Sequence, residues 1–141
     1  MSANTLTFAD MIPGLHQERE YTISKAVHQA FLEVSQDRSP IHVDKVAAME
    51  RGFAGRVMHG AILNAFLSHF IGMVFPGRNA LLLSVELRYA NPSYLDDTLL
   101  LSARVMHRSD SHSVVELKII FENRTRGVRA ASGKALVKVV A

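Results

Sequence analysis

The sequence predicts an α+β fold in which an antiparallel sheet wraps around one long, buried helix. Apolar residues in the first half recur at helical spacing and end in a long apolar stretch, whereas the second half is a series of strand-like runs separated by turn residues. A chain of 141 residues suits one domain over residues 1–141, and a 48% hydrophobic composition can fill its core without disulfides. A helix followed by consecutive strands is typical of a sheet that packs on one helix.

The first predicted helix covers residues 25–34, where Ser24 supplies a capping hydroxyl. Its spacing predicts an apolar side made of Ala26, Ala30, Phe31 and Val34. A turn-rich segment follows, and Pro40 favours an extended or turning backbone at Ser39.

Two further helices are predicted before the strands. Asp44 is expected to cap a short helix over residues 45–51, which Gly52 ends. The long helix starts near His59 and Gly60, continues to about Val74 and stops at a Phe-Pro-Gly sequence. Because this helix is apolar on nearly all sides, we expect it to be buried on most of them.

Four strands are predicted from apolar runs bounded by Asn-Pro, Asp-Asp, Ser-Asp-Ser and Arg-Gly turns. They cover residues 80–89, 98–107, 113–123 and 128–140. Val85, Leu87 and Tyr89 alternate with polar residues, as in a strand with one face in water.

Composition excludes several classes of protein. The chain has no cysteine, which excludes disulfides and thiolate metal sites and agrees with a cytoplasmic location. Its N-terminus lacks a secretory pattern, and His59, Asn64 and His69 interrupt the apolar stretch of residues 57–75, so neither secretion nor a membrane span is expected.

The formal net charge of +3 has two interpretations. It describes either a mildly basic surface or one that attracts an anionic ligand, such as the phosphates of coenzyme A or an acidic carrier protein. Nucleic acid is not expected as a partner, because the basic residues are scattered and no aromatic-rich basic segment accompanies them.

The segment FLEVSQDRSPIHVD resembles the signature of the MaoC-like, (R)-specific enoyl-CoA hydratases. The matching positions are Ser35, Asp37, Ser39, Pro40 and His42, followed by His59-Gly60, Ser68, Pro76-Gly77, Pro92 and Asp96-Asp97. The sequence departs from the family at Ser39, where the family has asparagine, and at Asn79 and Asp96, where it usually has glycine. Asn and Asp tolerate left-handed backbone better than most residues, so these turns are expected to persist.

The resemblance implies a homodimeric hot-dog fold and reversible hydration of a trans-2-enoyl thioester. Asp37 and His42 would jointly hold the catalytic water, in a loop supported by Ser35, Ser39 and Pro40. Ser68 would form a hydrogen bond near the Asp37 loop. No metal and no cofactor are implied beyond the coenzyme A or phosphopantetheine of the substrate, and no membrane is implied as a partner.

The start of the long helix is a candidate binding site for the thioester oxygen. Free backbone N–H groups lie at a helix N-terminus, and a glycine lets a ligand approach them closely, so the Gly60 N–H is assigned to the thioester oxygen. His59 is expected chiefly to orient this turn or pack inside, beside the substrate. Leu63, Phe66, Phe70 and Met73 could line an acyl pocket, although helix core is the simpler interpretation.

The sequence is also compatible with functions other than hydration. A hot-dog thioesterase would share the fold, but Leu63, Asn64 and Ala65 offer no carboxylate on the long helix. A non-catalytic acyl-thioester-binding subunit is the third hypothesis. A hydrolase triad of Ser68 with Asp37 and His42 is disfavoured, because Ser68 lies within a helix and not on a sharp, exposed turn. Arg104 and Arg108 could contact phosphates of coenzyme A, although solvated positions at strand ends are favoured.

Overall fold

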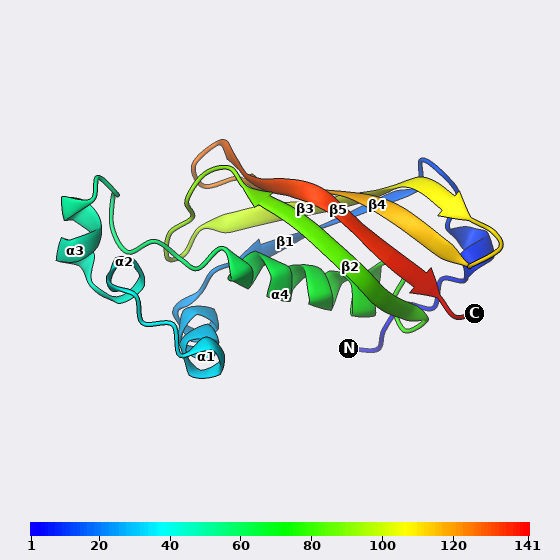
Figure 1. Cartoon of the computed structure of the whole chain (residues 1–141), viewed down its shortest axis with the longest axis horizontal. Coiled ribbons are helices and arrows are strands. Elements are labelled where there is room, and N and C mark those ends of the chain that lie inside the picture. Colours follow the sequence, from blue (N-terminus) through cyan, green and yellow to red (C-terminus); the bar gives the residue numbers. More distant parts are fainter.

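In the computed structural model, which describes all 141 residues, five strands form one antiparallel sheet in the order β1-β3-β4-β5-β2. The strands are β1 (His16–Thr22), β2 (Ala80–Tyr89), β3 (Thr98–Ser109), β4 (Val114–Asn123) and β5 (Val128–Val139). Figure 1 shows the sheet curving over helix α4 (Ala61–His69). The predicted hot-dog arrangement is therefore confirmed, and the four strands predicted after residue 80 are all present.

The core lies between α4 and the concave face of the sheet. The helix continues as a π-helical segment, η2 (Phe70–Val74), and together they bury Ile62, Leu67 and Phe70. Leu117 and Phe121 of β4 meet them in the same cluster. Each such side chain contributes about 1.5–3 kcal/mol when it leaves water. This burial fixes the start of α4 against the sheet.

The long helix is buried on most sides, as predicted, except on one face. Ala61, Ala65 and Ser68 are exposed, since only the opposite side of α4 packs against the sheet. The side chains on this exposed face are small. The helix sequence is therefore apolar on nearly all sides, although one side of the helix is not covered by the chain.

Strand β1 was not predicted, because the first half of the chain indicated helix and loop only. Its sequence, HQEREYT, has little apolar alternation, and most of its residues are exposed. It lies at the sheet edge, where it pairs with β3 from His16 opposite Arg104 to Thr22 opposite Thr98. An edge strand contributes little to the core, so hydrophobic periodicity does not reveal it.

Helices α1 (Lys25–Ser35), α2 (Pro40–Val43) and α3 (Lys45–Glu50) lie at one end of the molecule, away from the chain termini (Figure 1). The predicted caps are confirmed: the Ser24 hydroxyl accepts the Val27 N–H, and Asp44 accepts two N–H groups of α3. A short 3-10 helix, η1 (Phe8–Asp10), precedes β1. None of the helices has the length and apolar character that crossing a membrane requires.

The predicted apolar side of α1 is wrong for three of its four residues. Ala26, Ala30 and Val34 are exposed, Phe31 is partly buried against the core, and His28 and Leu32 are the buried residues of this helix. The buried face includes a histidine, which apolar periodicity does not count, so the inferred face was rotated away from the real one.

Candidate active site

Asp37 lies in the loop that joins α1 to α2, and the loop's own hydrogen bonds orient it. Its N–H donates to Ser35 Oγ over 3.1 Å, and its Oδ1 accepts the Ser39 N–H over 3.1 Å. Pro40 then begins α2, where a missing N–H costs nothing. Because Ser39 acts through its backbone, its replacement of the family's asparagine leaves this contact in place. The Asp37 side chain stays 49% exposed.

His42, on α2, faces the Asp37 carboxylate. Its Nδ1 lies 2.6 Å from the Val57 carbonyl oxygen, and its Nε2 lies 3.8 Å from Asp37 Oδ2. A carbonyl oxygen only accepts, so Nδ1 carries the hydrogen, and the neutral ring presents an unprotonated Nε2. Nε2 and the carboxylate are then two acceptors, too far apart for a direct hydrogen bond. This spacing suits a small donor between them.

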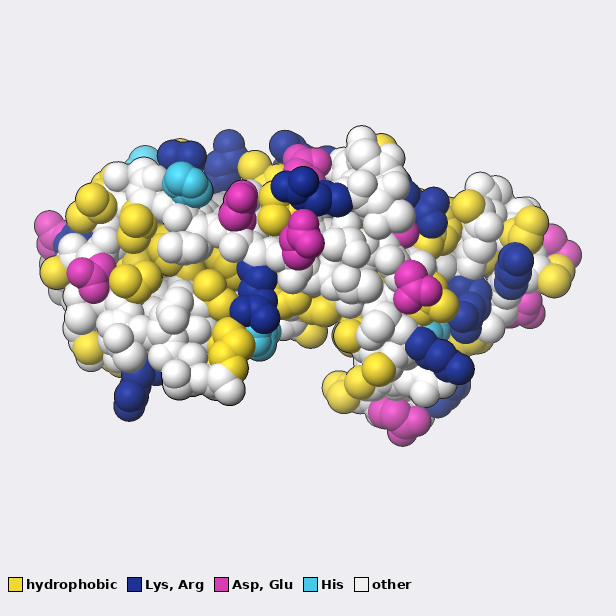
Figure 2. Space-filling model, turned by 180° about the vertical axis from the view of Figure 1, so that it is seen from behind, with side chains coloured by type: hydrophobic (Ala, Val, Ile, Leu, Met, Phe, Trp, Pro, Cys, Tyr) yellow, Lys and Arg dark blue, Asp and Glu magenta, His cyan; other side chains and the backbone are white.

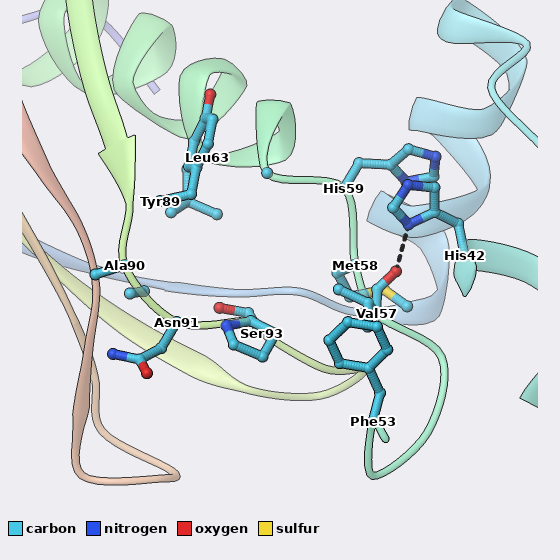
Figure 3. A pocket seen from close by; sticks show the side chains of 13 residues that line it. His42, Phe53, Val57, Met58, His59, Leu63, Tyr89, Ala90, Asn91 and Ser93 are labelled. Atoms are coloured by element: carbon cyan, nitrogen blue, oxygen red, sulfur yellow. Dashed lines mark hydrogen bonds between the residues drawn. The ribbon is translucent and has the colours of Figure 1, made fainter. Parts of the chain in front are cut away.

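His59 packs directly on His42 at the entrance to α4. Figure 3 shows the two rings stacked on each other. Their centroids are 3.8 Å apart. His59 Nε2 donates to the Asp37 carbonyl oxygen over 2.8 Å, which ties the loop of Asp37 to the start of the helix. The predicted role of His59 in orienting this turn agrees with this contact.

Asp37, His42 and His59 also bring three potential metal-ligand atoms within 4.8 Å of one another. Their positions in the sequence give no ligand motif, so the sequence did not indicate this cluster. His59 Nε2 would have to give up its bond to the Asp37 carbonyl to bind a metal. The contacts of the chain therefore favour proton transfer over metal binding here, and the absence of a metal site stays a prediction.

A cavity of about 290 Å³ opens beside the two histidines. Figure 3 shows His42 and His59 on one side and Tyr89 on another, with Phe53, Met58 and Leu63 also in the lining. Asp37 does not line the cavity itself; its carboxylate lies beside both imidazoles. Mainly apolar walls with a few polar groups are typical of a small-molecule site.

Gly60 lies in the cavity wall immediately before α4. Its N–H has no backbone acceptor, as expected at a helix N-terminus, and it is therefore available to a ligand. A Cβ at this position would lie 3.1 Å from the Tyr89 ring, so the glycine leaves room for that ring. The assignment of this N–H to a thioester oxygen stays a prediction.

Tyr89 lines the cavity and is bonded to Asn64 of α4, which lies outside the lining; the sequence did not indicate this pair. The Tyr89 hydroxyl donates a short hydrogen bond to Asn64 Oδ1 and so fixes its ring over Gly60. Partial burial raises the pKa of Tyr89, so the hydroxyl stays a neutral donor at physiological pH. Only the packing of β2 beside α4 joins these residues.

Several sequence candidates lie elsewhere. Ser68 is exposed and forms no hydrogen bond with the Asp37 loop, because this loop packs at the start of α4 and Ser68 lies about two turns further on. Arg104 donates to the Gly14 carbonyl, and Arg108 pairs with Asp110 at 3.0 Å. Leu63 lines the cavity, whereas Phe66 and Phe70 belong to the core.

His28, on α1, is a buried histidine behind the site. Its side chain is 2% exposed, its ring lies 5.8 Å from that of His59, and its Nε2 has no hydrogen-bond partner. Burial lowers the pKa of His28, and the positive charge of Arg56 and the neighbouring His59 and His42 lower it further. His28 therefore stays neutral in the folded chain at a pH where a free histidine is already protonated.

This histidine predicts an acid-sensitive fold. Below about pH 6.5 the unfolded chain binds a proton that folded His28 resists, so the free energy of unfolding should fall as the pH drops through that range. Urea unfolding between pH 7.5 and about 5 should show a shallower pH dependence for His28→Leu than for the wild type. His107→Gln, at an exposed position, is the matched control and should keep the wild-type slope. Equal slopes for His28→Leu and the wild type would contradict the prediction.

The five-stranded sheet curved over α4 and the position of the site at the start of that helix are features of the MaoC-like family. A family model described as "MaoC like domain" matches residues 12–123. The chain belongs to the MaoC-like family, and the predicted resemblance is confirmed.

Three relatives show how far the likeness extends. The chain is 27% identical to an (R)-specific enoyl-CoA hydratase of Aeromonas caviae over 78% of this chain and 81% of that protein. It is 35% identical to a mitochondrial 3-hydroxyacyl-[acyl-carrier-protein] dehydratase of Arabidopsis thaliana, but over only 51% of this chain and 42% of that protein. The unliganded R-hydratase of Pseudomonas aeruginosa superposes with a TM-score of 0.89 at 27% identity, covering 97% of this chain and 87% of that one.

Proposed function

We propose that the chain hydrates trans-2-enoyl thioesters to (R)-3-hydroxyacyl thioesters and catalyses the reverse dehydration. The observation that carries this proposal is the facing pair of Asp37 Oδ2 and His42 Nε2, 3.8 Å apart beside the cavity, with His42 Nδ1 directed at the Val57 carbonyl. In the neutral ring with its hydrogen on Nδ1, Nε2 is an acceptor like the carboxylate. Two acceptors can orient one water molecule through its two hydrogens, which leaves an oxygen lone pair directed at the substrate.

The reaction then needs no redox partner. The water oxygen bonds to C3 of the enoyl group while one of its protons passes to His42 Nε2. The other hydrogen stays on the new hydroxyl, held by the Asp37 carboxylate. The double-bond electrons move toward C2 and the thioester oxygen, and the imidazolium returns its proton to C2. Addition of one water thus balances, with His42 neutral at the start and at the end.

Charge that develops on the thioester oxygen needs a hydrogen-bond donor. The free N–H of Gly60 supplies one at the positive end of α4, in the same cavity wall as the two histidines. Stacking of His59 on His42 and its bond to the Asp37 carbonyl would hold base, carboxylate and donor in one geometry.

Cavity size favours a short acyl group. A volume of about 290 Å³ lies at the low end of the usual range for small-molecule sites. The direct test is therefore loss of enoyl absorbance when the protein is mixed with crotonyl-CoA, with chiral analysis of the 3-hydroxybutyryl product. An (S) product, or no hydration across short and long enoyl thioesters on coenzyme A and carrier protein, would contradict the proposal.

A thioesterase remains the alternative within this fold. The middle of α4 offers Asn64, whose side-chain oxygen is occupied by the Tyr89 hydroxyl, and no carboxylate. Release of free thiol from butyryl-CoA, followed with a thiol reagent in parallel with hydration, separates the two activities. Binding of both esters without turnover would instead favour a non-catalytic acyl-thioester-binding subunit.

We also propose that the chain forms a homodimer through β2. This strand lies at the sheet edge and exposes Leu81 and Leu83, 53% and 51% accessible. An unprotected apolar edge strand is a ready surface for pairing with another strand. A second copy of the chain is the simplest occupant, and Tyr89 on the same strand would bring the cavity close to the interface.

Replacement of Leu83 by lysine should disrupt this dimer, because the new charge would be buried between two strands. Light scattering after size exclusion should give twice the mass of the chain for the wild type and the single mass for Leu83→Lys at micromolar concentration. Met106→Lys adds the same charge at an exposed apolar position of β3 and should leave the mass unchanged. A monomeric wild type would refute the dimer.

A further inference from the structure

A second hollow, about 300 Å³ in volume, lies beside the cavity and gathers three basic side chains. Lys45 comes from the start of α3, Arg56 from the loop before α4, and Arg126 from the turn between β4 and β5. The remaining lining residues are Ala54, Gly55, Tyr94 and Leu95, so no carboxylate lines this basic hollow. Figure 2 shows Lys and Arg side chains scattered over one face of the molecule. Against this scattered distribution, three basic side chains that line one hollow form a local cluster.

Arg126 is held in place by a buried carboxylate beneath the hollow. Its Nε donates to Asp97 Oδ2 over 2.8 Å, and its guanidinium lies 4.0 Å over the Tyr94 ring. Lys45 and Arg56 have no carboxylate partner within ion-pair distance. Three positive charges against the one negative charge of Asp97 leave the hollow with a local excess of two positive charges. Such an excess attracts an anion.

Neutral donors in the same hollow are also unused. The Tyr94 hydroxyl accepts the Ala54 N–H over 3.3 Å, so its own hydrogen is free to donate. The N–H groups of Gly55 and Arg56 have no backbone acceptor. Fixed N–H and O–H donors beside Arg and Lys match the acceptor oxygens of a phosphate group.

The hollow and the active-site cavity share one wall. Phe53 and Val57 line the cavity, whereas the three residues between them line the basic hollow. The segment before β3 is divided in the same way, because Ser93 lines the cavity and Tyr94 lines the hollow. An isolated antiparallel β-bridge pairs Val57 with Tyr94 and so joins the two segments. A ligand that crosses this wall would place an acyl group on one side and an anionic group on the other.

We propose that the basic hollow binds a phosphate of the group that carries the acyl thioester, with Arg56 and Lys45 as the main contacts. This proposal rests on the hydratase function above, since it takes the acyl chain to lie in the cavity. The phosphate could belong to the phosphopantetheine shared by coenzyme A and carrier proteins, or to the nucleotide end of coenzyme A. Arg104 and Arg108, the sequence candidates for this role, are engaged by the Gly14 carbonyl and by Asp110 instead.

Binding titrations test the proposal without turnover. Calorimetry at low salt should show that the wild type binds coenzyme A at least about tenfold more tightly than pantetheine, which has no phosphate. 4′-Phosphopantetheine should share this gain only if the hollow holds the pantetheine phosphate. The double substitution Lys45→Gln and Arg56→Gln should remove that difference and leave the affinity for pantetheine unchanged. Lys118→Gln removes one exposed charge from β4 and is the control, expected to bind like the wild type.

Two further measurements separate the possible outcomes. If 3′,5′-ADP competes with coenzyme A, the hollow holds the nucleotide phosphates; if only 4′-phosphopantetheine competes, it holds the phosphate shared with carrier proteins. Unchanged coenzyme A binding in the double variant, or an equal loss of pantetheine affinity, would overturn the proposal. Because the titrations need no reaction, failure of the phosphate site is distinguishable from failure to hydrate crotonyl-CoA.

Discussion

Asp37→Asn should lower kcat/KM for crotonyl-CoA by about a thousandfold, within the range of a lost general acid–base group. The amide retains an oxygen that can accept the Ser39 N–H, so the loop should keep its shape. It also presents an N–H toward the water that the carboxylate would hold, and this donor reverses the required polarity. Steady-state hydration rates, with circular dichroism to confirm folding, measure the effect.

The partner substitution is His42→Asn. Its Nδ2 can keep the donation to the Val57 carbonyl while the reactive Nε2 is removed. Residues that act as a unit lose activity non-additively, so the double variant should be little worse than either single one. Glu33→Gln makes the same chemical change at an exposed position of α1 and should be fully active. Wild-type activity in Asp37→Asn would refute the assigned roles.

Gly133→Ala should cost about 3 kcal/mol of folding free energy or more, at the upper end of overpacking effects. Gly133 of β5 is paired with Leu87 of β2, and a Cβ there would lie 1.7 Å from the Glu86 carbonyl oxygen. The atoms that this Cβ would meet are backbone atoms of β2, which cannot yield as a side chain can, so the two strands must separate. Urea unfolding at fixed protein concentration measures the loss.

This substitution should also reach the active site. Tyr89 lies at the end of the displaced strand and forms part of the cavity wall. Hydratase activity should therefore fall when the pairing of β2 with β5 is disrupted. Gly72→Ala is the control, because a Cβ there meets nothing within 4 Å; it should leave stability unchanged or raise it slightly. Wild-type stability in Gly133→Ala would show that the sheet can relax at this crossing.

Local sequence signals identified most of the fold. Ser24 and Asp44 accept the N–H groups that their positions predicted, and the strands after Ala80 begin and end near the predicted turns. Asp96, which stands in place of a family glycine, adopts the expected left-handed backbone with a φ of 67°. These features depend on a few neighbouring residues, which is why the sequence alone indicates them.

Long-range packing decided what the sequence missed. Strand β1 exists because β3 offers it an edge, and His28 is buried because α1 turns that face inward. Tyr89 and Asn64 meet only because β2 runs beside α4. The spacing of residues in the sequence does not reveal contacts between residues so far apart in the chain.

The amino-acid sequence was enough to identify the groups of the candidate site: a carboxylate and an imidazole in one short loop, and a glycine at the start of the long helix. The hydrogen-bond partners of those groups became known only from the folded chain. The Val57 carbonyl sets which nitrogen of His42 carries the hydrogen, and His59 ties the Asp37 loop to the helix. The physical reason is that residue identity supplies donors and acceptors, whereas their protonation and direction depend on partners that folding brings from elsewhere in the chain.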